Sequence, residues 1–124
     1  LGLQNRINIL GQIDETNKFN FLKNSDIFIF PSISRSEAYG IVQLEAMFFR
    51  LPIINTFLDN GVNFLAPKNV AYTCEPKNSE EIIFAVNQLI TNNFLYQEKS
   101  DASFRNLNRF NFNKMLKLYQ NLFS

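Results

Sequence analysis

Two glutamates, Glu37 and Glu45, are the side chains of this 124-residue chain that are best placed for chemistry. Seven residues separate them, in a stretch where an apolar run ends at Pro31 and a turn follows. The apolar pattern that resumes after Gly40 predicts a helix, which carries Glu45 on an otherwise apolar surface. Because a buried carboxylate needs hydrogen-bond donors, a ligand rich in hydroxyl groups suits this pair.

The composition removes most other kinds of catalytic site. The chain has no histidine and a single cysteine, Cys74, which excludes disulfides, thiol–imidazole pairs, the serine triad and most zinc or iron sites. We expect no metal ion and no cofactor. The 12 basic and 11 acidic residues are spread without blocks, so the sequence predicts no nucleic-acid partner. No apolar run is long enough for a transmembrane helix and no leader opens the chain, so a cytoplasmic location is expected.

The elements that must position the two carboxylates alternate between short apolar runs and helical patterns. This alternation predicts one α/β domain with a Rossmann-like parallel sheet and flanking helices. Four strands are expected, at 7–10, 27–30, 53–56 and 70–73. The second is apolar on both faces and is therefore expected at the centre of the sheet, and the fourth at an edge.

Four helices are expected around this sheet. The first is short, is capped by Asp14 or Thr16, carries Phe19 and Leu22 and ends near Asn24. The second runs from 40 to about 50 and is buried on most sides. The third is capped by Ser79 and fades at 92–93, and its expected inner stripe is Ile82, Ile83, Val86, Leu89 and Ile90. The last covers about 112–123, whereas 94–109 is polar and only weakly periodic.

The turn between the strand at 27–30 and the second helix is the expected site. A parallel strand that turns directly into a helix brings free backbone N–H groups and the positive end of the helix dipole to the carboxyl edge of the sheet, which suits a phosphate. Gly40 allows close approach to the backbone. Side chains on a helix lean toward its N-terminus, so Glu45 can point at a ribose attached to a diphosphate bound there. Glu37 precedes the helix and can reach the sugar at the other end of such a ligand.

The pattern from Pro31 to Met47 resembles the donor-binding signature of retaining glycosyltransferases of family 4, which have the two-domain GT-B fold. The segment 1–11 is similar to that family's entry into the third strand of its C-terminal domain, 26–32 to the strand before the signature, and 109–112 to the start of its closing helix. The likeness covers nearly the whole chain, and it implies an incomplete half of a GT-B C-terminal domain, with 1–124 as a partial nucleotide-sugar-binding domain.

The resemblance also implies roles for individual residues. Glu37 would be the catalytic residue and bind the hydroxyls of the donor sugar, and Glu45 would bind the ribose. The backbone amides around Ala38, Tyr39, Gly40 and Ile41 would bind the diphosphate or the sugar. The implied reaction is transfer of a sugar from a nucleotide-sugar donor to a glycan or lipid-linked acceptor, with retention and without a metal ion. The complete enzyme would act in the cytoplasm or at the inner face of the membrane, with peripheral membrane association.

Two features depart from the family. Many relatives carry a Gly-Gly pair after the strand that corresponds to 53–56, whereas this chain has Phe57 to Asn63 there. The Arg- and Lys-bearing glycine loop that neutralises the diphosphate in relatives, and the N-terminal lobe that binds the acceptor, would precede Leu1. We therefore expect residues 1–124 alone to be inactive. A non-catalytic nucleotide-binding module, or a truncated remnant without transferase activity, is the alternative function.

Simpler interpretations of the same side chains remain open. Glu37 can be an ordinary loop carboxylate, and Glu45 can form a structural ion pair with Arg50 or Lys68. By the resemblance, the strand at 7–10 would lie apart from the strand at 27–30, with two strands between them. We expect that this chain shifts the first strand onto the second, fills the gap with another chain, or is poorly stable.

Overall fold

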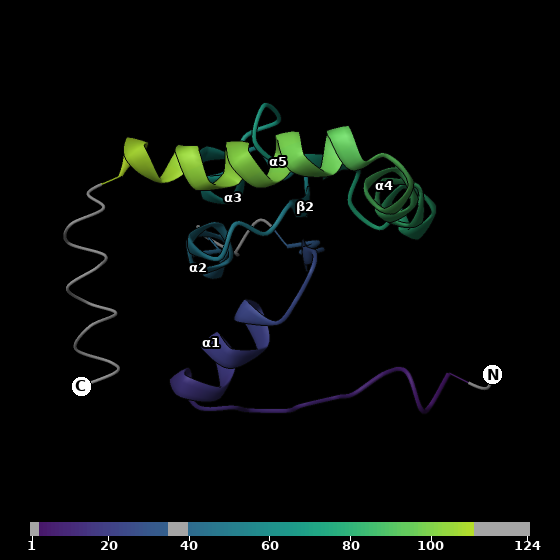
Figure 1. Ribbon diagram of the computed structural model, residues 1–124. Coiled ribbons are helices and arrows are strands. Elements are labelled where there is room, and N and C mark those ends of the chain that lie inside the picture. The colour runs from purple at the N-terminus through teal and green to yellow at the C-terminus, as the bar shows by residue number, and fades with distance from the viewer. Residues whose placement is uncertain (1–2, 35–39, 111–124) are drawn as a thin grey trace.

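The protein forms an α/β domain around a three-stranded parallel sheet, seen in a computed structural model that describes residues 3–34 and 40–110 (Figure 1). The strand order is β1-β2-β3, with β1 at Phe28–Phe30, β2 at Ile53–Thr56 and β3 at Tyr72–Cys74. Both pairs are parallel, and Ile29 lies beside Ile54 in the register. The expected α/β class with a Rossmann-like parallel sheet and flanking helices is confirmed.

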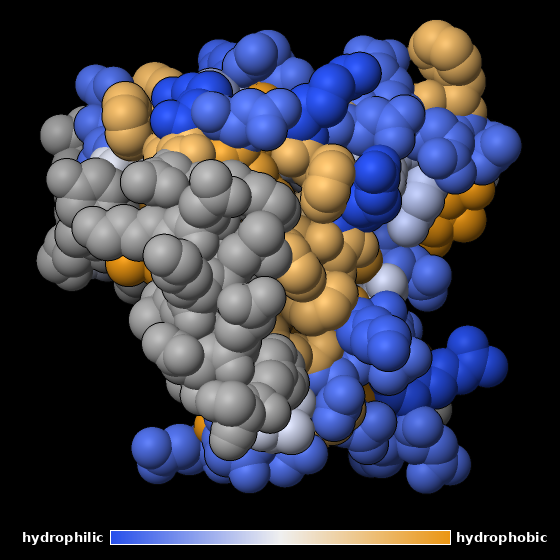
Figure 2. Space-filling view, turned by 60° about the vertical axis from the view of Figure 1, so that its left-hand side comes forward, coloured by the Kyte–Doolittle hydropathy of each residue, from blue (hydrophilic) through white to orange (hydrophobic). Residues whose placement is uncertain are grey.

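Helices cover both faces of the sheet (Figure 1). Helix α1 spans Glu15–Lys23, α2 Val42–Phe48, α3 Gly61–Leu65, α4 Ser79–Thr91 and α5 Asn93–Asn106, and a 3-10 turn covers Leu107–Arg109. One apolar core lies between the sheet and the helices α1, α2 and α5, and a second lies between the sheet and α4. Apolar side chains also reach the surface on the face turned forward in Figure 2.

The centre of the sheet is β2, and the prediction that the strand at 27–30 is central is wrong. All four residues of β2 are buried, whereas Ile29 in β1 is 40% exposed. Among the described residues no strand pairs with the other side of β1. The strand at 70–73 is at an edge, as expected, although it begins two residues later, at Tyr72.

The expected strand at 7–10 does not form. These residues run as an extended segment away from the sheet, drawn in purple in Figure 1. Ile7 is 58% exposed and Ile9 is 93% exposed, so neither contributes to a core. The alternation of apolar side chains suits a strand, but a strand needs a neighbour for its backbone groups, and no strand among the described residues pairs with this segment. The segment is not shifted onto β1 either.

Helix α1 follows the prediction. Asp14 caps it by accepting a hydrogen bond from the backbone N–H of Asn17, and Phe19 and Leu22 are buried. The helix ends at Asn24.

Helix α4 differs from the prediction in its cap and in its buried face. Asn78, not Ser79, is the N-cap, and its side chain accepts a hydrogen bond from the backbone N–H of Glu81. Ile83 and Ile90 are 59% and 68% exposed, so these two members of the expected inner stripe face outward. The buried positions are Ala85 and Leu89.

Two helices arise in segments where none was predicted. Helix α3 begins after the N-cap Asn60, and α5 occupies most of the polar stretch 94–109. The expected helix at 112–123 lies outside the described residues. Within 3–34 and 40–110, no helix is long and apolar enough to cross a membrane.

Candidate functional site

The turn that leads into α2 lies at the carboxyl end of β1, where the sequence predicts the site. Glu37, Ala38 and Tyr39 lie outside the described residues, so their predicted roles stay predictions. Gly40 and Ile41 follow them at the start of α2, and Glu45 lies within the helix. The structure therefore describes three of the six predicted site residues.

Gly40 is buried and has a positive φ of 58°. A Cβ atom added at this position would stand 2.8 Å from Cε1 of the Phe30 ring. Both the backbone conformation and the contact with β1 therefore require glycine. Ile41, the next residue, is 65% exposed, and its side chain caps no backbone group of α2.

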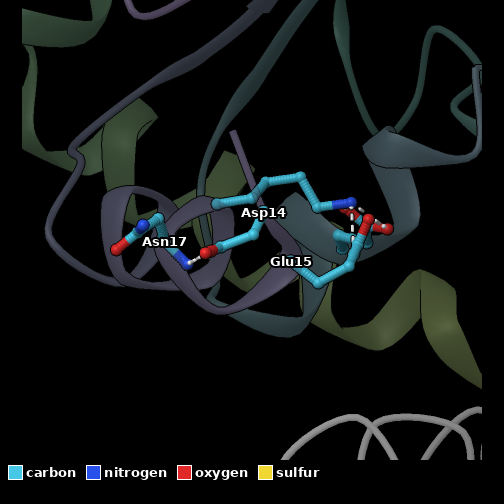
Figure 3. Close-up of polar contacts among 5 residues, drawn as sticks. Asp14, Glu15 and Asn17 are labelled. Atoms are coloured by element: carbon cyan, nitrogen blue, oxygen red, sulfur yellow. Dashed lines mark hydrogen bonds and ion pairs between the residues drawn. The ribbon is translucent and has the colours of Figure 1, made fainter. Parts of the chain in front are cut away.

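Glu45 lies in an ion pair that joins α2 to α1. Its two carboxylate oxygens stand 3.1 Å and 3.0 Å from Nζ of Lys18, and Nζ also lies 2.7 Å from the carboxylate of Glu15. Figure 3 shows the Glu15 side chain turned toward the ion pair, and Asp14 capping the N-terminus of α1. The sequence alone suggests Arg50 or Lys68 as the partner in a structural ion pair of Glu45. The ion pair forms, but its partner is Lys18, so that choice of partner is wrong. Arg50 pairs with Asp101 at 3.3 Å and lies over the Phe104 ring.

Lys18 is the residue at this site that sequence reasoning missed. Its spacing from Glu15 on one helix predicts their contact, but Glu45 lies 27 positions further along the chain. Only the packing of α1 against α2 brings these two residues together.

The environment shifts the pKa values of both partners. Burial raises the pKa of the Glu45 carboxyl above its ordinary value, and the hydrogen bond from Lys18 offsets part of that rise. Burial alone would lower the pKa of Lys18, but its hydrogen bonds to Glu15 and Glu45 outweigh this, and the pKa is raised. The Glu45 side chain is only 13% exposed, and its Oε2 atom accepts no hydrogen bond although it lies in the ion pair. The Glu45 carboxylate is thus largely desolvated, and Lys18 is its charged partner.

The loop after β2 borders the same edge of the sheet. Asp59 has a positive φ of 52°, and Oδ1 of Asn63 accepts hydrogen bonds from the backbone N–H groups of Leu58 and Asp59. The amide of Asn63 donates to the carbonyl of Thr56. Asn63 therefore gives this loop a defined shape where many members of the resembled family have a Gly-Gly pair.

A concave surface formed by described residues lies at the other end of β1. A hollow of about 660 Å³ opens at the amino end of β1, between that strand and the helices α4 and α5. Asp26 lines this hollow, and the backbone carbonyl of Asp26 accepts a hydrogen bond from the Tyr96 hydroxyl. Among the described residues, no group of three or more acidic or cysteine side chains could hold a metal ion.

Comparison with known proteins places this fold in a family. The sequence model of the family described as glycosyl transferases group 1 matches residues 1–108. The chain belongs to this family, and it corresponds to part of the C-terminal domain of a GT-B glycosyltransferase of the family 4 type.

Individual relatives support the same assignment. The chain is 30% identical to the O-antigen chain mannosyltransferase C of Escherichia coli over 127 residues, which covers 99% of this chain and 33% of that protein. It is 37% identical over 93 residues to an uncharacterized glycosyltransferase of Haemophilus influenzae, covering 73% of this chain and 26% of that protein. The chain thus spans between a quarter and a third of the length of these relatives.

A solved structure shows the fold. The C-terminal domain of a group 1 family glycosyl transferase from Francisella tularensis superposes with a TM-score of 0.73 at 24% identity, covering 87% of this chain and 55% of that one. The expectation of part of a GT-B C-terminal domain is confirmed.

Proposed function

We propose that this chain supplies the donor-binding part of a retaining glycosyltransferase, which transfers a sugar from a nucleotide-sugar donor to a glycan or lipid-linked acceptor. The observation that carries the proposal is the buried Glu45 carboxylate beside the Gly40 turn, at the carboxyl edge of a parallel sheet in a group 1 glycosyl transferase. In this proposal the Glu45 carboxylate, whose side chain is 13% exposed, accepts a hydrogen bond from a ribose hydroxyl, because a charged acceptor binds a hydroxyl more strongly than a neutral one.

The remaining residues act on the other parts of the donor. The backbone amides from Ala38 to Ile41 face the diphosphate or the sugar, and Glu37 binds hydroxyls of the sugar that is transferred. During transfer the bond between the anomeric carbon and the diphosphate breaks, and its electron pair goes to the leaving phosphate oxygen. The hydroxyl oxygen of the acceptor bonds to the anomeric carbon, and its proton goes to the leaving diphosphate. Groups that bind this oxygen more strongly as its charge grows lower the barrier. The proposal includes no metal ion and no cofactor besides the donor.

The acceptor and part of the diphosphate site come from outside these 124 residues in this proposal, from an N-terminal lobe and from basic residues of a glycine loop. The complete enzyme works in the cytoplasm, at the inner face of the membrane when its acceptor is a lipid. A second candidate is a nucleotide-binding module without transferase activity. It is favoured by Lys18, whose charge is already paired with two carboxylates.

Titration of a nucleoside diphosphate into the complete protein tests the assignment of Glu45. We expect Glu45→Gln to weaken binding severalfold or more while the domain stays folded, because a neutral amide is a weaker acceptor for hydroxyls than a carboxylate. Glu80→Gln, at an exposed position in the first turn of α4, is the matched control and should bind like the unmodified protein. Equal affinities of all three proteins would remove Glu45 from the ribose site.

Steady-state kinetics of the complete protein test Glu37. Glu37→Gln should lower turnover with a nucleotide sugar more than it lowers affinity for the bare nucleoside diphosphate, since the proposal places Glu37 at the sugar. Full turnover in this variant would mean that Glu37 is only a loop carboxylate. Binding by the unmodified protein without any transfer would favour the nucleotide-binding module.

A further inference from the structure

A buried chain of polar side chains runs from α2 across β2 to β3. The Thr73 hydroxyl donates to Oδ1 of Asn55 at 2.8 Å, and Nδ2 of Asn55 donates to Oε1 of Gln43 at 2.9 Å. Gln43 and Asn55 are both 0% exposed. From Thr73 through Asn55 to Gln43, each hydrogen bond runs from donor to acceptor in the same direction, so each amide has one defined orientation.

The same two amides also hold α3. Nε2 of Gln43 donates to the carbonyl of Val62 at 3.0 Å, and Nδ2 of Asn55 donates to the carbonyl of Ala66 at 3.0 Å. Val62 lies in the first turn of α3, and Ala66 is its C-cap. The network therefore fixes both ends of the short helix that follows the loop at 57–60.

Gln43 also touches the turn that leads into α2. Its backbone N–H donates to the carbonyl of Gly40 at 2.9 Å, and its Nε2 would stand 3.4 Å from a Cβ atom at Gly40. A second tie runs parallel to this one, because the Thr56 hydroxyl donates to the carbonyl of Ser32. The loop after β1 and the loop after β2 are thus joined through directional hydrogen bonds.

Polar amides are an expensive way to fill this position. Asn55 lies in the central strand, where an apolar side chain would fill the space without the cost of desolvating an amide. Once desolvated, each amide must keep its partners, because an unsatisfied buried group costs more than a normal hydrogen bond contributes. What the amides add over apolar packing is a fixed direction and distance between α2, β2 and α3.

We propose that Gln43 and Asn55 are positioning residues of the donor site. They hold the Gly40 turn and Glu45 on one side, and the segment 57–63 on the other, in the arrangement that binds the donor. This inference rests on the proposed function. The loop at 57–63 lacks the Gly-Gly pair, and its shape comes from Asn63 and from this network. A fixed arrangement of two loops favours affinity because the protein loses less freedom on binding.

Variants that remove single bonds test the proposal in the complete protein. Gln43→Met and Thr73→Val keep the volume and lose a polar partner, whereas Thr73→Ser keeps the hydroxyl. Asn106→Leu is the matched control, since Asn106 is a buried amide that donates to the carbonyl of Leu65 but has no bond to Gln43 or Asn55. Amide hydrogen exchange and titration of a nucleoside diphosphate are measured for each variant at a temperature where all are folded.

We expect faster exchange confined to 40–43 and 57–63, and roughly tenfold weaker binding, in Gln43→Met and Thr73→Val. Thr73→Ser should recover both properties, and Asn106→Leu should change neither beyond its effect on global stability. The proposal is overturned by exchange that rises equally across the domain, or by unchanged affinity in the folded variants. If the unmodified protein binds no nucleotide, the proposed function fails, and the exchange comparison still decides whether the network couples the two loops.

Discussion

At the scale of single residues, Lys18 decides the electrostatic state of the site. Burial raises the pKa of the Glu45 carboxyl, and the hydrogen bond and charge of Lys18 offset part of that rise. For a carboxyl with a raised pKa in the folded state, the neutral form is favoured by folding. The contribution of such a carboxyl to stability is fully present below the pKa that it has in the unfolded chain. It is lost as the pH rises through the pKa that it has in the folded protein. Glu45 is therefore least costly to the fold at acidic pH, and Lys18 reduces its cost at neutral pH.

Lys18→Met should destabilise the domain in a pH-dependent way. At pH 7 we expect a loss of about 1–2 kcal/mol, less than for a fully buried pair because the Lys18 side chain is 25% exposed. The loss should shrink as the pH falls through the raised pKa of Glu45, because the protonated carboxyl no longer needs a cation. Thermal unfolding of the variant and the unmodified protein across this pH range measures the difference.

Lys23→Met provides the control, since it makes the same change in the last turn of the same helix at an exposed position. Its effect should be small and nearly independent of pH. A loss in Lys18→Met that stays constant from acidic to neutral pH would mean that lost packing, and not the charge of Glu45, explains its stability.

At the scale of elements, the sequence predicts those whose local signals need no partner. Asp14 followed by a helical pattern gives α1, and the short run that begins with Ile53 and Ile54 gives β2. The strand expected at 7–10 has the right pattern, but no strand within 3–34 and 40–110 lies beside it, and a pattern cannot reveal that. Helix α5 is missed for another reason. Its buried residues are Ser100, Ser103 and Asn106, small or polar side chains that give no apolar stripe, so its stability comes from packing.

The candidate site is predicted in part for the same reason. Gly40 and Glu45 stand out in the sequence because one is a glycine at a turn and the other is a charge on an apolar helix. Lys18 does not, because its ion pair with Glu45 depends on how two helices pack. Asn55 does give a signal, a polar residue within an apolar strand, but its partners Gln43 and Thr73 become apparent only in the folded chain.

The N-cap of α4 gives a direct test at this scale. Asn78 and Ser79 are adjacent and both are common cap residues, but only Asn78 accepts the hydrogen bond from Glu81. Asn78→Ala should cost about 1 kcal/mol of stability, whereas Ser79→Ala should be nearly neutral because Ser79 is already helical and exposed. Denaturant unfolding of the two variants compares them, and a larger loss for Ser79→Ala would restore the cap predicted from the sequence.

At the scale of the whole molecule, the sheet is open along β1. Ile29 of β1 and Ile54 of β2 are register partners in neighbouring parallel strands, so their side chains lie on the same face of the sheet. Ile54 packs against α4 on that face. Ile90 of α4 lines the hollow at the start of β1 together with Ile27, and Ile83 lies seven residues before it on the same side of the helix. We call Ile27, Ile29, Ile83 and Ile90 the open-edge surface. It combines apolar side chains with a strand edge to which no described strand pairs, and this combination favours association.

The last prediction concerns residues 1–124 as an isolated chain. The segment at 7–10 does not cover β1. The open-edge surface should therefore make the chain self-associate as its concentration rises, or give it a low melting temperature. Ile29→Lys should reduce association, since a lysine on an edge strand opposes pairing with another chain. Phe84→Lys, at an exposed apolar residue of α4 outside this surface, should not.

The isolated chain should also show no glycosyl transfer, because the acceptor site and the phosphate cations lie elsewhere in the proposed enzyme. Light scattering, thermal melting and a donor-hydrolysis assay measure these properties, and a stable monomer or measurable transfer would contradict the argument.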